Sequence, residues 1–253
     1  MLSDAKFLIH CTGDWKPGHV QVAWSPSTRP IEPRVEQEID RAWAAASARL
    51  GANLFDGPMC RLEKWAASPA ELQLSFSRTS YRTFLGTNLM NSNFAQQWGE
   101  GILANAVGAS TVLETADRWL MLGRRNQSVA YYPNRVHPFA GALEPNDPMD
   151  VFDEVRRELR EELSMDSKDI AELRCLGIAM DKNLLQPELI FHARSALTRM
   201  QTEATLNPAE HVAVFPVRAA EFDVRQAMDE PVLTPIARAS LSMWLHATGS
   251  VFS

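Results

Sequence analysis

The sequence predicts an α/β fold, a mixed β-sheet sandwiched between helices and preceded by a small N-terminal β-β-α-β unit. Short runs of alternating apolar and polar residues, which are typical of half-buried strands, recur along the chain. Longer segments near residues 33–50, 148–163 and 235–246 carry apolar residues at helical spacing. Strands interspersed with a few helices favour a sheet with a helix on each face.

The N-terminal unit is predicted from four elements. Strands are expected at 7–11 and 20–25, on either side of a glycine- and proline-containing turn. A helix is expected from about Pro33 to Leu50, with Gly51 just past its end. A strand around Cys60–Trp65 closes the unit near Pro69. We therefore expect an N-terminal α/β unit at 1–69 and a larger domain at 70–253.

The larger domain is predicted to be rich in strands. Leu72, Leu74 and Phe76 alternate with polar residues and indicate its first strand. Further strands are expected at 106–115, 118–125, 173–180, 188–196 and 211–217. A loop punctuated by proline and glycine is expected from 133 to 148, and a closing helix from about Pro235 to His246.

The segment that follows this loop carries three carboxylates within five residues. Val151, Val155, Leu159 and Leu163 recur every four residues and predict an amphipathic helix, for which Asp147 and Pro148 are the expected N-cap and first residue. Glu158, Glu161 and Glu162 then converge beside the apolar stripe and make a candidate site for a hard divalent ion such as Mg²⁺. The alternative is a solvated acidic face whose acids pair with Arg156, Arg157 and Arg160.

Composition narrows the classes of partner and compartment. The net charge of −6 and the lack of a basic stripe argue against nucleic-acid binding. The 3 cysteines are widely spaced, which indicates a reducing compartment and neither a disulfide framework nor a zinc site. With no apolar run long enough for a membrane span and no signal-peptide pattern, we expect a cytoplasmic protein without a membrane partner. The oligomeric state stays open.

The carboxylate segment resembles the end of the Nudix box, G-x5-E-x7-R-E-U-x-E-E-x-G-U with U aliphatic. Arg157, Glu158, Leu159, Glu161 and Glu162 match it, and Met165 fits the last apolar position. The box glutamate falls on Met149 and its first glycine on Leu143, while Gly141 stands two residues too early and Ser164 replaces the last glycine. The departures affect the loop and the salt bridge that orients the helix, for which Glu144 or Asp150 would have to supply the partner of Arg157.

Longer strings resemble one branch of the Nudix family, the animal enzymes that cleave UDP-glucose and UDP-galactose. They are Leu54–Pro58 (LFDGP), Thr79–Asn88 (TSYRTFLGTN), Gly101–Leu103 with Gly108 downstream, Arg124–Pro145 and Leu176–Ala179. The resemblance covers most of the chain and thins after about residue 200. It implies a Nudix-type α/β/α sandwich and a nucleotide-sugar diphosphatase.

Carried over position by position, the resemblance implies a set of site residues. Glu158 and Glu162 would hold Mg²⁺ or Mn²⁺, and Glu161 would be a further ligand or a base. Arg157 would orient the helix. The substrate would be contacted by six residues, which are Phe55, Tyr81, Arg125, Ala130, His137 and Glu144. Positions 137 and 142 hold His and Ala where the branch carries an acid and a histidine, which weakens the inference there.

Three functions follow in order of preference. The first is Mg²⁺-dependent hydrolysis of UDP-sugars to UMP and sugar 1-phosphate, with Phe55 or Tyr81 stacking on uracil. The second is hydrolysis of another nucleoside diphosphate derivative such as ADP-ribose, and the third is non-catalytic nucleotide-sugar binding. Without the resemblance, Phe55 and Tyr81 read as core aromatics. Glu210 is a weaker candidate for a base in a loop and reads first as a surface acid.

Overall fold

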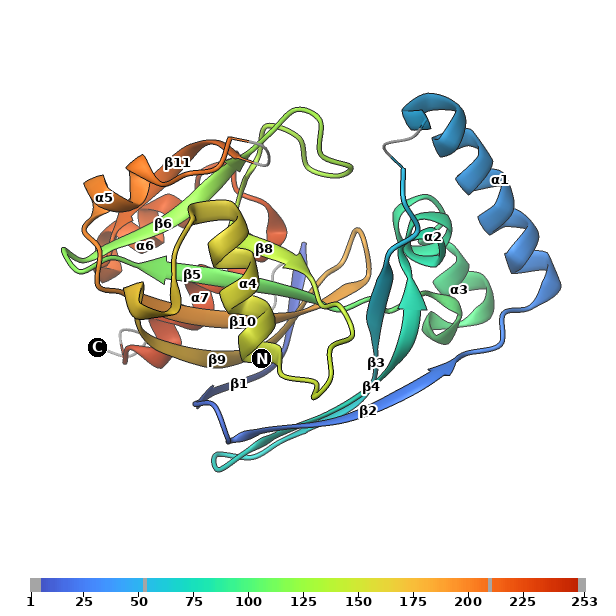
Figure 1. Cartoon of the computed structure of the whole chain (residues 1–253), viewed down its shortest axis with the longest axis horizontal. Coiled ribbons are helices and arrows are strands. Elements are labelled where there is room, and N and C mark those ends of the chain that lie inside the picture. The colour runs from blue at the N-terminus through green and yellow to red at the C-terminus, as the bar shows by residue number, and fades with distance from the viewer. Residues whose placement is uncertain (1–5, 52–53, 209–210, 250–253) are drawn as a thin grey trace.

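Two β-sheets organise the computed structural model, which describes residues 6–51, 54–208 and 211–249 (Figure 1). The larger sheet is mixed, because β10 runs parallel to β5 whereas β1, β9, β6 and β11 pair antiparallel with their neighbours. Its strands follow in the order β1 (Phe7–Trp15), β9 (Ile170–Asp181), β10 (Gln186–Ser195), β5 (Gly108–Glu114), β6 (Trp119–Arg125) and β11 (His211–Arg218).

Helices cover both faces of the large sheet. The stripe of α4 (Val151–Leu163), made of Val151, Val155, Leu159 and Leu163, is buried in one apolar core. The helix α7 (Pro235–Ala247) fills a second core on the opposite face, together with α6 (Glu221–Met228). The predicted α/β/α sandwich is therefore confirmed. Two smaller helices, η4 (Ser167–Asp169) and α5 (Arg199–Ala204), lie in the connections after α4 and β10.

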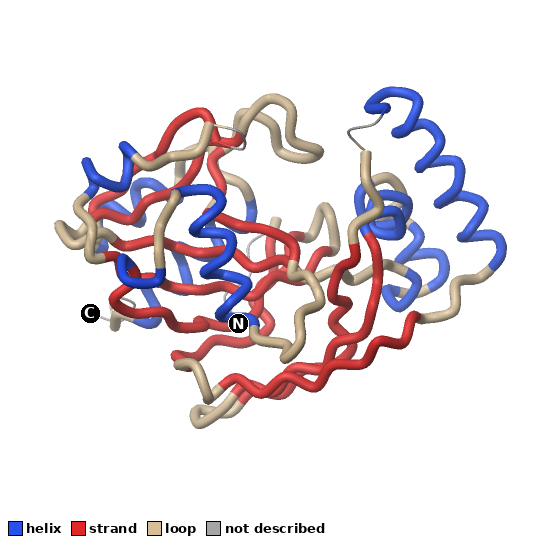
Figure 2. The backbone as a smooth tube through the Cα atoms, viewed as in Figure 1, coloured by secondary structure: helices blue, strands red, loops and turns tan. Residues whose placement is uncertain are grey.

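The smaller sheet has three strands, in the order β2 (Val20–Thr28), β4 (Leu72–Ser80) and β3 (Pro58–Ala67). Figure 2 shows it beside the large sheet, with helices at its far end. The long helix α1 (Pro33–Leu50) has the predicted bounds and buries Val35 and Ile39. Shorter helices follow β4, namely α2 (Tyr81–Phe84), the π-helix η2 (Leu85–Leu89), α3 (Phe94–Trp98) and η3 (Glu100–Ile102).

A division of the chain at residue 69 does not follow these sheets. The strand β1 pairs with β9 in the large sheet, so it lies outside the small unit. The hairpin of β3 and β4, paired from Pro58↔Ser80 to Ala67↔Leu72, spans residue 69 and keeps both strands in one sheet. We therefore propose that the small unit is an insertion of about residues 20–103, placed between β1 and β5. Strand pairing over long sequence separations, which local patterns do not reveal, is the physical reason for the difference.

The segment predicted as a loop at 133–148 contains two short strands. β7 (Val136–His137) pairs with β6, and β8 (Phe139–Ala142) pairs with β5. The strands predicted elsewhere are present but most extend further, as β1 and β9 do. The three cysteines are free thiols. None of the helices in the described ranges is long and apolar enough to cross a membrane.

Candidate active site

The helix α4 starts and ends differently from the sequence prediction. Its N-cap is Asp150, whose carboxylate accepts a hydrogen bond of 2.7 Å from the Phe152 amide. The prediction of Asp147 and Pro148 for these positions is wrong, because the two residues precede the cap. At the other end Ser164 is left-handed, with φ of 51°, and its amide donates to the Arg160 carbonyl. A left-handed residue favours glycine, which explains why the box pattern has glycine there.

Two carboxylates of α4 face β8 and are buried. Glu158 is 9% and Glu162 2% exposed, and the Ala140 amide of β8 donates to Glu162 Oε2 at 3.1 Å. A Cβ on Gly141 would lie 2.1 Å from the Glu158 carboxylate, so this strand position has no room for a side chain. Gly141, two residues away from the expected box glycine, is thus the glycine that lets β8 approach Glu158.

Arg157 forms hydrogen bonds with three carboxylates of its own helix, α4. Its guanidinium donates to Glu158 Oε1 at 2.6 Å, to Glu154 Oε2 at 3.0 Å and to Glu161 at 3.1 Å. Burial disfavours the charged guanidinium and by itself would lower the pKa of Arg157. The three carboxylates have the larger combined effect, so the pKa of Arg157 is raised. The expected partners, Glu144 and Asp150, are not the ones observed. Glu154 is a partner of Arg157 instead, and its Oε1 accepts a hydrogen bond of 2.8 Å from Asn146 Nδ2.

The three predicted metal ligands are not gathered into one cluster. The Glu161 side chain is 57% exposed and bonded to Arg157, whereas Glu158 and Glu162 point under the helix. Within the described residues, no group of three or more His, Cys, Asp or Glu side chains is arranged to hold a metal ion. Two buried carboxylates one helical turn apart are nonetheless the hard oxygen donors that Mg²⁺ takes. Their chemistry fits the ion, and Arg157 and His211 occupy their oxygens here.

A cluster made of His211, His137 and Arg125 borders the buried carboxylates. His211, the first residue of β11, places Nε2 at 3.0 Å from Glu162 Oε1. A Cβ on Gly123 would lie 2.3 Å from the His211 ring, so glycine makes room for it. His137 is buried and its Nδ1 lies 2.8 Å from Thr234 Oγ1. Burial lowers the pKa of His137 well below its usual value, with further lowering from Arg125 and His211. An uncharged imidazole is therefore expected at His137.

Arg125 connects this cluster to the small unit. Its guanidinium lies 4.8 Å from the centroid of the Tyr131 ring. Tyr131 contacts Phe84 of α2 edge to face at 6.4 Å, and Phe84 in turn contacts Tyr81. Arg125 is 8% exposed, and its Nε has no hydrogen-bond partner in the described part of the chain. A buried donor without a partner is costly, so a ligand acceptor at this point would be stabilised.

The remaining predicted residues lie at the surface. Phe55 is 75% exposed, two residues before Gly57, whose carbonyl accepts from the Tyr81 amide at 2.9 Å. Ala130 and Glu144 are exposed. The structure thus brings Glu158 and Glu162 together, and links Tyr81 to Arg125 through two aromatic rings. Glu210 lies outside the described residues.

Sequence reasoning missed Glu154, Tyr131 and His211. Glu154 had a usable signal, because Glu154, Glu158 and Glu162 are spaced by four and share one helix face. His211 had none, because it reaches the site through the pairing of β11 with β6, which is distant in sequence. Tyr131 had none either, because its place over Arg125 depends on the path of the loop that follows β6.

Comparison with known proteins identifies relatives over most of the chain. No family model matches it. The chain is 30% identical over 234 residues to human uridine diphosphate glucose pyrophosphatase NUDT22, covering 78% of this chain and 76% of the relative. The Bos taurus protein of that name is 26% identical, with 98% of both chains covered. Nudix hydrolase 9 of Arabidopsis thaliana is 23% identical, with 75% of this chain and 73% of the relative covered.

Solved structures overlap about half of the chain. A MutT protein from Methanosarcina mazei Go1 superposes with a TM-score of 0.40 at 13% identity, covering 56% of this chain and 94% of its own. NrtR from Shewanella oneidensis has a TM-score of 0.42 at 13% identity, covering 57% of this chain and 64% of its own.

Proposed function

The chain belongs to the Nudix hydrolase family, and from this premise we propose that it hydrolyses the diphosphate bond of UDP-sugars. UDP-glucose and UDP-galactose are the proposed substrates, and UMP and sugar 1-phosphate the products. The names of the mammalian relatives support the substrate class. The observation that carries the reaction class is the buried pair Glu158 and Glu162, one turn apart on α4 above Gly141.

These two carboxylates would hold Mg²⁺, or Mn²⁺ in its place. When bound, the ion supplies neutralisation of the diphosphate charge and lowers the pKa of an attacking water. Glu161 is proposed as a further ligand or as the base. In either role its carboxylate has to leave Arg157, to which it is bonded in this structure. Arg157 is a positioning residue, because its three bonds fix the orientation of the acids along α4.

Arg125 is proposed to bind the diphosphate. Its guanidinium presents donors in a fork that matches two phosphoryl oxygens. Stacking over Tyr131 fixes the plane of the group, and the unbonded Nε leaves a donor for an incoming oxygen. The neutral ring of His137 adds little positive charge at this point, so Arg125 carries most of the attraction on the side of β6.

The small unit is proposed to bind the uridine. The ring of Phe55 is 75% exposed, which leaves a free face for a planar base, and Tyr81 lies close to it in the fold. Stacking of a base on an aromatic side chain contributes roughly 1–3 kcal/mol. Ala130, His137 and Glu144 are retained as proposed contacts along the nucleotide.

A substrate screen tests the proposal. Purified protein with millimolar Mg²⁺ is incubated separately with UDP-glucose, UDP-galactose and ADP-ribose, and the products are identified by ³¹P NMR. We expect UMP and hexose 1-phosphate from both UDP-hexoses, loss of turnover with EDTA, and recovery when Mg²⁺ is added in excess. Cleavage of ADP-ribose with UDP-hexoses left intact would contradict the substrate and favour another nucleoside diphosphate derivative. Turnover that persists in EDTA would contradict the metal.

A further inference from the structure

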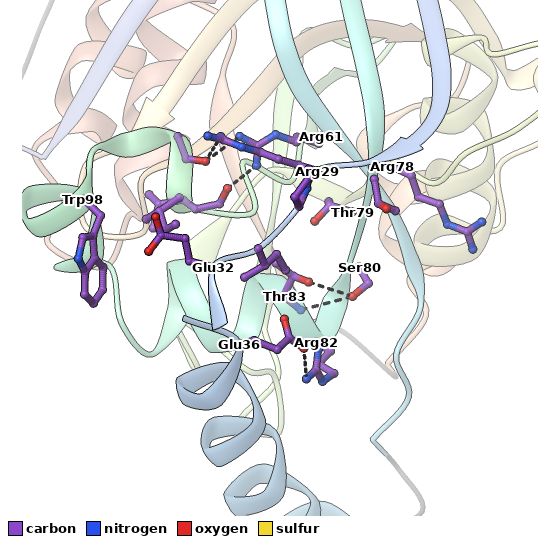
Figure 3. A pocket seen from close by; sticks show the side chains of 16 residues that line it. Arg29, Glu32, Glu36, Arg61, Arg78, Thr79, Ser80, Arg82, Thr83 and Trp98 are labelled. Carbon is purple, nitrogen blue, oxygen red and sulfur yellow. Dashed lines mark hydrogen bonds and ion pairs between the residues drawn. The ribbon is translucent and has the colours of Figure 1, made fainter. Parts of the chain in front are cut away.

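A cavity lies in the small unit, and its lining does not include α4. It encloses about 780 Å³ and is lined by the end of β2, the start of α1, β3, the end of β4, α2 and residues 98–103 (Figure 3). Ligand sites commonly have volumes of about 300–1,000 Å³. The lining contains no residue of α4 and none of the proposed substrate-binding residues. The cavity is therefore separate from the carboxylates of α4, although Ser80 and Arg82 in its lining flank Tyr81 in the sequence.

Two arginines from different elements meet at one carbonyl in this cavity. Arg29, between β2 and α1, donates through Nη1 to the carbonyl oxygen of Gly101, and Arg61 of β3 donates through Nη2 to the same atom at 3.2 Å. Arg61 also donates to the Leu103 carbonyl. Burial lowers the pKa of Arg61, and the neighbouring charge of Arg29 lowers it further, while Glu63 opposes both effects. The two guanidinium groups thus repel each other across a neutral acceptor.

The carboxylates around the cavity do not balance this pair. Glu63 Oε1 lies 3.1 Å from Arg61 Nε, and Glu36 Oε1 lies 2.6 Å from Arg82 Nη2. Arg29 has no carboxylate within ion-pair distance among the residues that the structure describes. Within the described ranges, the charge of Arg29 is therefore not paired with a carboxylate where Arg29 meets Arg61. An anion placed there would relieve the repulsion and accept charge-assisted hydrogen bonds.

Polar and aromatic side chains line the rest of the cavity. Ser80 and Thr83 lie on one side of the cavity, with their hydroxyl oxygens 3.4 Å apart, and Glu32 and Trp98 lie on the other side (Figure 3). Glu32 is the N-cap of α1, yet its side chain makes no capping bond, so its carboxylate is available as an acceptor. Trp98 is 39% exposed and packs edge to face on Phe94. Hydroxyls, a carboxylate and an indole are the groups that bind a polyol.

We propose that this cavity is a second ligand site, which binds a phosphorylated sugar with its phosphate between Arg29 and Arg61. The sugar hydroxyls meet Glu32, Ser80 and Thr83, and Trp98 covers one face of the ring. The site needs neither the metal nor the acids of α4, so it stands independently of the reaction proposed above.

Isothermal titration in EDTA tests the site, with glucose 6-phosphate, inorganic phosphate and glucose as probes. Glucose 6-phosphate is not a product of the proposed reaction, and EDTA keeps the metal out of the Nudix site. We expect saturable binding of one glucose 6-phosphate per chain, and at least about tenfold weaker binding of inorganic phosphate or glucose. No saturation by glucose 6-phosphate at concentrations of tens of millimolar would overturn the proposal. Equal affinity for inorganic phosphate would overturn the sugar half of it.

Two variants locate the binding. Arg29→Gln removes the unbalanced charge and should weaken glucose 6-phosphate by about tenfold or more. Gly101→Ala places a Cβ 2.8 Å from Arg29 Nη1, and should displace this flexible, exposed side chain with a similar loss. Arg225→Gln, on the exposed face of α6, is the matched control and should bind as the unaltered protein does. Unchanged affinity in both Arg29→Gln and Gly101→Ala, with circular dichroism showing intact folds, would place the ligand elsewhere.

Discussion

The buried carboxyl groups of α4 and that of Glu188 on β10 are stabilised in different ways. On α4, Glu154 and Glu158 are bonded to Arg157, and Glu162 to His211. On β10, Glu188 is 3% exposed, and the hydroxyl of Ser110 donates a hydrogen bond to its Oε2. Burial and the neighbouring charge of Asp181 raise the pKa of Glu188, Ser110 and Arg125 oppose them only in part, and the resulting pKa is about 7. The comparison teaches that a buried carboxyl group whose hydrogen bond comes from a neutral hydroxyl, and not from a cation, favours its protonated form.

The largest effect is expected from Glu158→Gln combined with Glu162→Gln. Losing the two proposed metal ligands should remove several kcal/mol of charge stabilisation, so kcat for UDP-glucose should fall by about 10³-fold or more. Steady-state kinetics with product detection measure it. Asp153→Asn, on the exposed side of the same helix, is the control and should change kcat little. A double variant that folds and keeps its activity would end the assignment of the α4 acids to catalysis.

The second prediction concerns Glu188→Gln and the pH dependence of stability. Because the pKa of Glu188 is raised from 4.5 to about 7, its contribution to stability is complete below pH 4.5 and is lost as pH rises through 7. The variant should lack this loss, which amounts to about 3 kcal/mol for a buried group. Urea unfolding at pH 5 and pH 8 measures the difference, with Glu221→Gln on α6 as control. An identical pH dependence in the variant and the unaltered protein would show that Glu188 is ionised at neutral pH.

Two glycines on paired strands allow a matched comparison of the two sites. A Cβ on Gly141 of β8 would lie 2.1 Å from the Glu158 carboxylate, and one on Gly108 of β5 would lie 2.9 Å from Glu188 Cγ. Each alanine should cost about 1–3 kcal/mol of stability through overpacking. Gly141→Ala should also lower kcat by about 10²-fold, because it moves Glu158, an acid of the proposed reaction centre. Equal losses of activity in both variants would mean that the two buried acids are not separate in function.

The smallest effect is expected from Arg157→Lys. Lysine keeps the charge but cannot bond three carboxylates from one planar group, so kcat should fall by about tenfold while the fold persists. Mg²⁺ titration of the initial rate checks whether a higher metal concentration compensates. Activity equal to that of the unaltered protein would show that a positive charge at position 157 is sufficient to position the acids of α4, and that the planar guanidinium is not required.

The sequence predicted the regular elements whose pattern is local. The four-residue spacing of Val151 to Leu163 placed α4, and Pro33 with Gly51 placed α1. The start of α4 was predicted wrongly because both Asp147 and Asp150 are good caps, and only the path of the chain decides between them. β7 and β8 were missed because Pro138 and Gly141 mark a loop in sequence terms, although β5 and β6 supply the hydrogen bonds that make them strands.

The candidate site was predictable only in part for a related reason. Helical periodicity alone places Glu158 and Glu162 on one face of α4. The same periodicity also places Glu154 on that face, so Glu154 could have been predicted as a member of the site. The contacts of Arg125 with Tyr131, and of His211 with Glu162, depend on how β6, β11 and the following loop meet in space. The carboxylate of Glu161 lies on the same helix, yet Arg157 draws it to the surface, and that choice between neighbouring partners has no signature in the pattern.

The pairing of β1 with β9 limits how this protein can be shortened. Because β1 forms one edge of the catalytic sheet, a chain beginning at residue 70 would lose more than an accessory module. It would expose the edge of β9 that pairs with β1, while β10 still pairs with the other edge, and such an exposed edge invites self-association through strand addition. Removing the small unit cleanly would instead require joining the end of β1 directly to the start of β5.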